Sequence, residues 1–499
     1  LKNKIYYMSV WRVKPVSAFE ADMKKNDLKR VLTRWGLTSL GIGAIIGGGI
    51  FTLTGIAAHD YAGPALALAF VIAGIGCLFA SLCYAEFASV LPVEGSAYAY
   101  AYGTVGELFA WFIGWNLILE YMMGATTVAV AWSGYFVKLL HLFGIEFPIW
   151  LCNDMATATE KSLAANLAAP SFAFNLPAFL ITWVVTAILV KGIKEAAKTN
   201  NIIVIIKIAV VLFVIIVGAF YVKTENWVPF IPDEIPALDE LGNATGKMNF
   251  GFGGVLTAAT IVFFAYIGFD AVSTQAGEAI NPKKDVPFAI VASLIICTVL
   301  YILVSLVLTG MVKYTELDRA APVASAFSGI GINWAVFIIT IAATAGLTSV
   351  MLVMMLGQTR IFLGMAKDGL MPAFFKVLHP VFKTPYKSTI LVGGLISLVA
   401  AFTPIERVSE MCSMGTLLAF AMVCVAVMIL RYKKPELERP YKTPAVYLVG
   451  TLGVAFNLFL MTQVRAATWN FFLIWGVLGV IVYFIYGKRN SNLEKQGIE

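Results

Sequence analysis

The stretch Gly41-Ile-Gly-Ala-Ile-Ile-Gly-Gly-Gly-Ile-Phe51 decides the fold, because it combines membrane-level hydrophobicity with a weak backbone. Five of its eleven residues are glycine, inside an apolar run long enough to cross a bilayer. A lipid-exposed helix does not tolerate an interrupted backbone, since no water satisfies the freed N–H and C=O groups. Packing motifs space their glycines four apart, whereas Gly47, Gly48 and Gly49 are consecutive. A glycine-rich packing face is the alternative, but the triplet favours a broken helix of the kind that transporters use for binding.

The composition predicts a polytopic membrane protein. Of the 499 residues, 60% are hydrophobic and only 13% are charged, which is about half the charged share of a soluble domain. No hydrolase-type Ser/His/Asp motif and no glycine loop followed by Lys-Ser/Thr is present, so we expect no enzyme. Six cysteines without paired spacing and three scattered histidines predict no metal site and no cofactor. The basic residues lie in short loops, so no nucleic-acid partner is expected either.

Twelve apolar stretches reach the roughly 20 residues that a membrane-spanning helix needs. They run over 37–58, 65–91, 104–137, 176–190, 199–222, 251–277, 286–312, 333–359, 388–404, 410–431, 444–464 and 468–487. Lys and Arg are concentrated in the leader, in alternate connections and in the tail. The positive-inside rule then places both termini in the cytoplasm, and we expect a multi-pass protein of the plasma membrane.

The spans divide the chain into an ordered series of parts. These are a cytoplasmic leader (1–35), helices one to five (36–222), an extracellular loop (223–250), helices six to ten (251–431), helices eleven and twelve (432–487) and a cytoplasmic tail (488–499). The sixth span carries a second weak point, where Gly268 and Asp270 interrupt an apolar run. The two weak points lie five helices apart, and since five is odd, the second set of five helices is inverted relative to the first. This predicts an inverted repeat with a binding site between two broken helices.

Several motifs resemble the amino acid–polyamine–organocation (APC) superfamily. They are Gly41–Phe51, Cys83–Pro92, Gly95–Tyr98 and Phe263–Thr274, followed by Asn281 and Pro282. Leu28–Leu32 and Gly357–Arg360 resemble its cationic amino acid transporter (CAT) branch. The chain departs from the family at Gly277-Glu278, where members often carry paired glutamates. The resemblance implies an all-α, LeuT-like fold with a five-plus-five inverted repeat, broken helices one and six and two extra C-terminal helices. It also implies amino-acid transport by alternating access.

The resemblance further implies a substrate site made of main chain. Members of the family bind the α-carboxylate at N–H groups that correspond to Gly48 and Gly49. They bind the α-ammonium at carbonyls that correspond to Ile45, Phe264, Ala265 and Ile267. Helix N-termini attract anions and exposed C-terminal carbonyls attract cations, so the chemistry agrees with the two breaks.

Lys207 is a lysine in the middle of the fifth span, and ionisable residues at this depth are functional candidates. It is alternatively a lysine that snorkels to the headgroups. Proton-coupled relatives place a lysine on this helix where sodium-coupled relatives hold an ion, so the resemblance favours proton coupling. A buried amine can exchange a proton near neutral pH.

Two further residues are candidates for the pocket wall. Glu120 lies near the middle of the third span and matches an acidic residue that some of the branch carry beside the substrate. The alternatives for Glu120 are that it shapes a polar wall of the pocket, that it couples transport to protons, or that it forms a hydrogen bond to a neighbouring helix. Met351 on the eighth span would narrow the pocket and favour small or apolar side chains, unless it fills the core. Glu86 and Asp270 are expected to organise or gate helices rather than to touch substrate.

The sequence thus predicts a proton-coupled symporter of small neutral L-amino acids, with cationic L-amino acids as a further class. An amino-acid exchanger and a membrane amino-acid sensor are the alternatives. The expected partners are the amino acid, protons and membrane lipids. A small single-span partner and a bound sterol-like lipid stay open.

Overall fold

The computed structural model describes residues 12–15, 32–90, 96–192, 196–238, 244–273 and 279–495. Most of the expected leader and the Gly277-Glu278 departure lie outside these residues. The longer helices are α4 (Leu66–Val90), α6 (Glu107–Leu142), α8 (Leu176–Lys191), α9 (Ala196–Ala219), α11 (Pro282–Met311), α13 (Asn333–Lys367), α14 (Tyr386–Phe402), α15 (Ile405–Lys433), α16 (Val446–Gln463) and α17 (Ala466–Val482).

Shorter elements connect these helices or interrupt them. The α-helical ones are α2 (Arg34–Ile45), α3 (Thr54–Ile56), α5 (Ser96–Tyr102), α7 (Met155–Ala164), α10 (Gly251–Val262), α12 (Pro322–Gly329), α18 (Lys488–Asn490) and α19 (Asn492–Lys495). The π-helical turns are η1 (Gly49–Leu53), η2 (Ala57–Ala62) and η10 (Tyr483–Gly487). The 3₁₀ turns are η3 (Gly63–Ala65), η4 (Ile149–Leu151), η5 (Thr224–Trp227), η6 (Phe263–Tyr266), η8 (Tyr314–Glu316) and η9 (Ala373–Lys376). Strands β1 (Ile235–Leu238) and β2 (Ala244–Asn249) form an antiparallel pair in which Ile235 faces Asn249.

Local sequence signals account for several helix starts. Thr33 caps α2 by accepting a hydrogen bond from the Gly36 N–H at 3.2 Å. Asn175 caps α8 by accepting from the Ala178 N–H at 3.2 Å. These caps satisfy backbone donors that have no partner within the helix. Proline in the first turn of α8, α11 and α12 fits the same positions, because its missing N–H costs nothing there.

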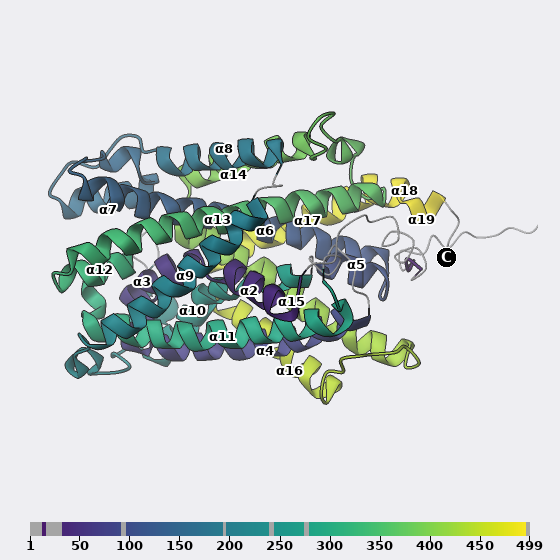
Figure 1. The fold of residues 1–499 in the computed structure, drawn as a ribbon, viewed down its shortest axis with the longest axis horizontal. Coiled ribbons are helices and arrows are strands. Elements are labelled where there is room, and N and C mark those ends of the chain that lie inside the picture. The colour runs from purple at the N-terminus through teal and green to yellow at the C-terminus, as the bar shows by residue number, and fades with distance from the viewer. Residues whose placement is uncertain are drawn as a thin grey trace, which may run out of the picture.

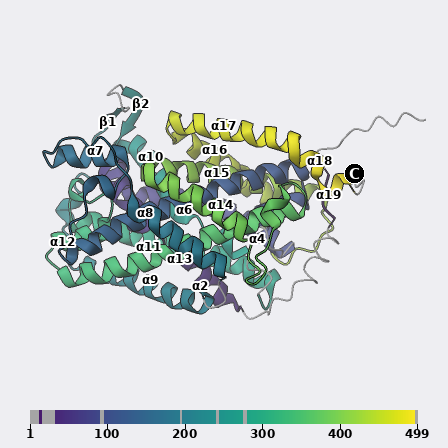
Figure 2. The same ribbon diagram turned by 90° about the horizontal axis from the view of Figure 1, so that it is seen from above.

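The molecule is an elongated bundle whose helices run mostly along one axis (Figure 1). α4 packs against α11 and α15, α6 against α13 and α15, α8 against α14, and α15 against α16. α7, α12 and the β1–β2 pair lie at one end, which we call the loop end (Figure 2). α5, α18 and α19 lie at the opposite end, which we call the terminal end.

The outer surface of the bundle is suited to lipid. On α8, Leu180, Val184 and Ile188 recur every fourth residue and are exposed, and α17 exposes most of its apolar side chains. Within the described residues, eight helices are long and apolar enough to cross a membrane, and three shorter apolar helices accompany them. The chain is therefore an integral membrane protein of almost purely helical structure, while the count of twelve spans stays a prediction.

Candidate functional site

The first helix is interrupted at the glycine triplet. α2 ends at Ile45, Ile46 is extended with φ −70° and ψ 104°, and helical structure resumes with η1 at Gly49. A Cβ atom on Gly49 would overlap the backbone of Ala265. Only glycine at position 49 therefore allows these two backbone segments to approach each other this closely.

The second interruption lies directly against the first. α10 ends at Val262, η6 follows, and Ile267 is extended with φ −61° and ψ 132°. Gly268 has φ +120°, a conformation that favours glycine. A Cβ there would lie 2.9 Å from the carbonyl of Ala44, in the last turn of α2. The two weak points that the sequence marks thus meet in the interior of the bundle.

Tyr301 of α11 joins the two interruptions. Its hydroxyl lies 2.9 Å from the Ile45 carbonyl oxygen and 3.0 Å from that of Ala265. One hydroxyl donates one hydrogen bond at a time, so one of these carbonyls stays available to another donor. Sequence reasoning missed Tyr301, whose available signal was a hydroxyl within an apolar helix.

Lys207 is fully buried and points to the first break. Its Nζ donates to the carbonyl oxygens of Gly43 at 2.9 Å and Ile46 at 3.2 Å. Its side chain also packs against Gly346 of α13. These contacts exclude the snorkelling alternative in this conformation, since the amine binds backbone in the protein interior.

Of the remaining predicted site residues, Phe264 lies beside the glycine triplet, Met351 is buried on α13, and Glu120 lies between α6 and α15. Phe264 lies against Gly48, together with Ala131 and Leu347, while Val350 lies against Gly47. Met351 is buried one residue further along α13. Glu120 is buried on α6 next to Gly415 and Cys412 of α15.

A cavity of about 550 Å³ leads from the loop end toward the first break. It reaches Thr52, in η1 just beyond Gly49, and Gly134 of α6. Its lining includes several ionisable residues: His59, Lys138, Asp154, Glu160, Lys161, Asp318, Arg319 and Glu406. The glycine triplet itself is not part of the lining, and Thr52 is the lining residue nearest to it along the chain.

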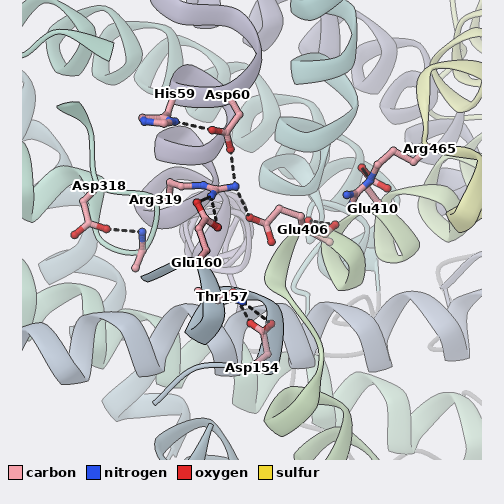
Figure 3. Close-up of polar contacts among 12 residues, drawn as sticks. His59, Asp60, Asp154, Thr157, Glu160, Asp318, Arg319, Glu406, Glu410 and Arg465 are labelled. Atoms are coloured by element: carbon pink, nitrogen blue, oxygen red, sulfur yellow. Dashed lines mark hydrogen bonds and ion pairs between the residues drawn. The ribbon is translucent and has the colours of Figure 1, made fainter. Parts of the chain in front are cut away.

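Arg319 organises this mouth (Figure 3). Its guanidinium contacts Asp60 at 2.8 Å, Glu160 at 2.7 Å and Glu406 at 3.3 Å, which belong to η2, α7 and α15. Partial burial works against the charge, but the carboxylates, Asp60 first, raise the pKa of Arg319 above its usual value. A permanently charged arginine therefore joins three elements around the opening. Sequence reasoning missed it, because a single arginine in a loop carries no signal of its partners.

Buried carboxylates join several elements at the terminal end. Glu86 of α4 contacts Arg431 at 2.6 Å and Arg439 at 3.2 Å, and it also accepts from the Thr443 N–H at 2.8 Å. Glu107 of α6, equally buried, accepts hydrogen bonds from Tyr102, Tyr483 and Ser491. Arg12 and Glu494 join this network from the two chain ends.

Comparison with known proteins identifies the relatives of this chain. Residues 32–485 match the family model described as amino acid permease. The chain is 44% identical to the branched-chain amino acid permease BcaP of Bacillus subtilis, over 98% of this chain and 99% of that protein. It is 42% identical to the methylthioribose transporter of the same organism, over 98% of this chain and all of that protein. It is 37% identical to the vacuolar cationic amino acid transporter 4 of Arabidopsis thaliana, over 83% of this chain and 66% of that protein.

Proposed function

This chain belongs to the amino acid permease family of the APC superfamily, and from that premise we propose that it transports small neutral L-amino acids together with protons. The observation that carries the proposal is the meeting of two interrupted helices, with Lys207 bound to the first. Alternating access in a five-plus-five inverted repeat with two extra helices would move substrate past this point. In this arrangement the loop end faces outward and both termini lie in the cytoplasm.

The main chain would hold the parts that all amino acids share. The α-carboxylate would bind the N–H groups of Gly48 and Gly49, at the N-terminal end of η1. The α-ammonium would bind carbonyls of the two breaks, namely those of Ile45, Phe264, Ala265 and Ile267. Tyr301 supports this assignment, because its single O–H leaves one of two neighbouring carbonyls unoccupied.

The substrate's side chain would meet apolar walls. The side chains that lie next to Gly47 and Gly48 are those of Ala131, Phe264, Leu347 and Val350. Such a surface favours neutral, apolar side chains, since a cationic one would lose its hydration without a partner. Met351 would narrow the same space. Methylthioribose, the solute named for one relative, lacks the carboxylate and ammonium that the breaks would recognise.

Lys207 would couple protons to movement at the first break. Its ammonium holds the carbonyls of Gly43 and Ile46, on either side of the end of α2. Loss of the proton would remove the charge that holds these carbonyls and weaken the bonds. The inner half of the first helix would then be released.

Uptake into proteoliposomes tests the proposal. We expect labelled leucine or alanine to accumulate under an inward proton gradient without sodium, and arginine and methylthioribose to accumulate less. Lys207→Ala should lose accumulation while keeping counterflow, and Lys191→Ala, which removes an exposed lysine at the end of α8, should keep both. Accumulation retained in Lys207→Ala would refute the coupling role.

Two other results would select the alternatives. Counterflow without gradient-driven accumulation in the unmodified chain indicates an exchanger. Substrate binding without any flux indicates a sensor.

A further inference from the structure

Tyr135 of α6 contacts the main chain just beyond the first break. Its side chain is fully buried, and its hydroxyl donates to the carbonyl oxygen of Phe51 at 2.6 Å. The two aromatic rings also meet edge to face, with 6.1 Å between their centroids. Phe51 is the middle residue of η1, two positions after Gly49. A buried hydroxyl from α6 therefore fixes a carbonyl of the turn that begins at the glycines.

Phe51 connects Tyr135 to the glycine triplet. The N–H of Phe51 donates to the carbonyl oxygen of Gly47 at 3.3 Å, while its own carbonyl accepts from Tyr135. Gly48 and Gly49 lie between these two bonded residues in the chain. The position of η1 therefore determines where the N–H groups of these two glycines point.

One face of α6 follows this segment. Ala131 lies four residues before Tyr135, and residues at this spacing share a face of a helix. The Ala131 side chain lies next to Gly48, and Tyr135 contacts Phe51 one turn further along. α6 thus meets the first helix at the triplet and again just beyond it.

The same hydroxyl lies close to the loop end. The backbone N–H of Val323, in the first turn of α12, also acts on the Tyr135 hydroxyl, and α12 packs against η1. Gly134 and Thr52, the chain neighbours of Tyr135 and Phe51, line the cavity of about 550 Å³. Tyr135 therefore joins α6, α12 and η1 directly behind the lining of this cavity.

The outer part of the first helix benefits from an external bond. It consists of the π-helical turns η1 and η2 with only the three residues of α3 between them. Such turns interrupt the regular α-helical hydrogen bonding and often occur at functional sites, and glycine adds backbone freedom. A carbonyl oxygen has two lone pairs, so Phe51 can accept from Tyr135 without giving up a helical donor. One hydroxyl can therefore restrict the movement of η1.

We propose that Tyr135 is a positioning residue for the substrate: its hydroxyl fixes η1 so that the N–H groups of Gly48 and Gly49 are directed at the α-carboxylate. The identity of this ligand rests on the proposed function, whereas the hold on η1 rests on the bond to Phe51. Removing the hydroxyl keeps the ring but lets η1 turn, which weakens binding of a carboxylate. A ligand without a carboxylate makes no use of these N–H groups and should be affected less.

Binding calorimetry on the full chain in lipid nanodiscs tests this difference with leucine and with leucinamide, which lacks the carboxylate. Tyr135→Phe should weaken leucine binding about three- to tenfold, as expected for one hydrogen bond, and should weaken leucinamide binding clearly less. Tyr483→Phe is the matched control, because it removes a buried hydroxyl that donates to Glu107 at the terminal end, and it should change neither affinity. An equal loss for both ligands, or no loss for leucine, would overturn the proposal.

Hydrogen–deuterium exchange without ligand tests the hold on η1 separately. Backbone amides of residues 47–56 should exchange faster in Tyr135→Phe than in the unmodified chain and in Tyr483→Phe. Unchanged exchange would overturn the role of Tyr135, whereas faster exchange in a chain that binds no leucine would refute the proposed function and with it the ligand named here. If Tyr135→Phe does not fold, 3-fluorotyrosine at position 135 replaces it. Fluorine makes the hydroxyl a stronger donor, so exchange of this segment should slow, and unchanged exchange would again overturn the proposal.

Discussion

Both ends of the bundle are joined by ion pairs between arginine and carboxylate side chains, but these pairs differ in how far they are buried. At the loop end, Arg319 is 36% exposed and joins three carboxylates around a cavity of about 550 Å³. At the terminal end, Glu86 and Glu107 are fully buried and surrounded by donors. Exposed ion pairs contribute little to stability, whereas breaking a buried pair leaves a costly uncompensated charge. The ion pairs of the loop end are therefore the easier ones to separate, and those of the terminal end are the costlier ones to break.

Removing the buried carboxylate of Glu86 should have the largest effect. Glu86→Ala removes the carboxylate that pairs with Arg431 and Arg439 and that accepts from the Thr443 N–H, although Arg439 keeps its backbone carbonyl partners. We expect the variant to lose about 3–5 kcal/mol of stability, the cost of breaking a buried pair from one side. Thermal unfolding in detergent measures it, and Glu436→Ala, which removes an exposed glutamate near the same end, is the control. Equal melting of the two variants would show that burial does not distinguish the ends.

A substitution at the centre, where the two breaks meet, should have the next largest effect. A methyl group on Gly49 would overlap the Ala265 backbone, so Gly49→Ala should destabilise the chain by about 1–3 kcal/mol. It should also weaken substrate binding, because the breaks are forced apart. Gly364→Ala on α13 has open space and should be neutral or stabilising. Isothermal titration calorimetry and unfolding would compare the two, and normal binding by Gly49→Ala would refute the close approach.

Changing Arg319 should affect access more than stability. Arg319→Gln releases Asp60, Glu160 and Glu406, yet should cost less than about 1 kcal/mol because the site is partly exposed. Access is measured by the rate at which a thiol reagent labels Thr52→Cys in a Cys152→Ser background, since both residues line the cavity. We expect labelling to rise several-fold over the rate with Arg319 present. Lys313→Gln, an exposed change at the same end, should leave the rate unchanged, and no increase with Arg319→Gln would show that this arginine does not hold the mouth.

Salt should produce the smallest effect, and it should act differently on the ion pairs of the two ends. Raising the ionic strength to about 1 M shortens the Debye length to about 3 Å and screens exposed pairs far more than buried ones. Labelling of Thr52→Cys should therefore rise with salt, while the stability that Glu86 contributes should change little. A parallel salt dependence of both measurements would contradict the contrast in burial.

Several features could be predicted from the sequence because they depend on one segment. The glycine triplet marked the end of α2, and the apolar composition predicted a membrane protein. Membership of the APC superfamily, inferred from motifs, is confirmed by the family model and the relatives. The absence of an enzymatic motif agrees with the transporter family. Proton coupling, substrate preference and the roles of the site residues stay predictions.

Other features arise only when distant segments meet. Tyr301 contacts Ile45, which is 256 positions away in the sequence, and Tyr121 contacts Asp270, which is 149 positions away. Neither partner is visible in a local pattern, because a helix can turn any face toward its neighbour until packing selects one.

The sequence by itself determined where the backbone would break, that the chain would lie in a membrane, and which family it joins. Those properties follow from local backbone freedom and from transfer of apolar surface out of water. Only the tertiary structure decided that Lys207 binds the first break, that Tyr301 joins the two breaks, and that the ion pairs at one end are buried while those at the other line a cavity. These depend on the rotation and depth of each helix, which the packing of the whole bundle sets.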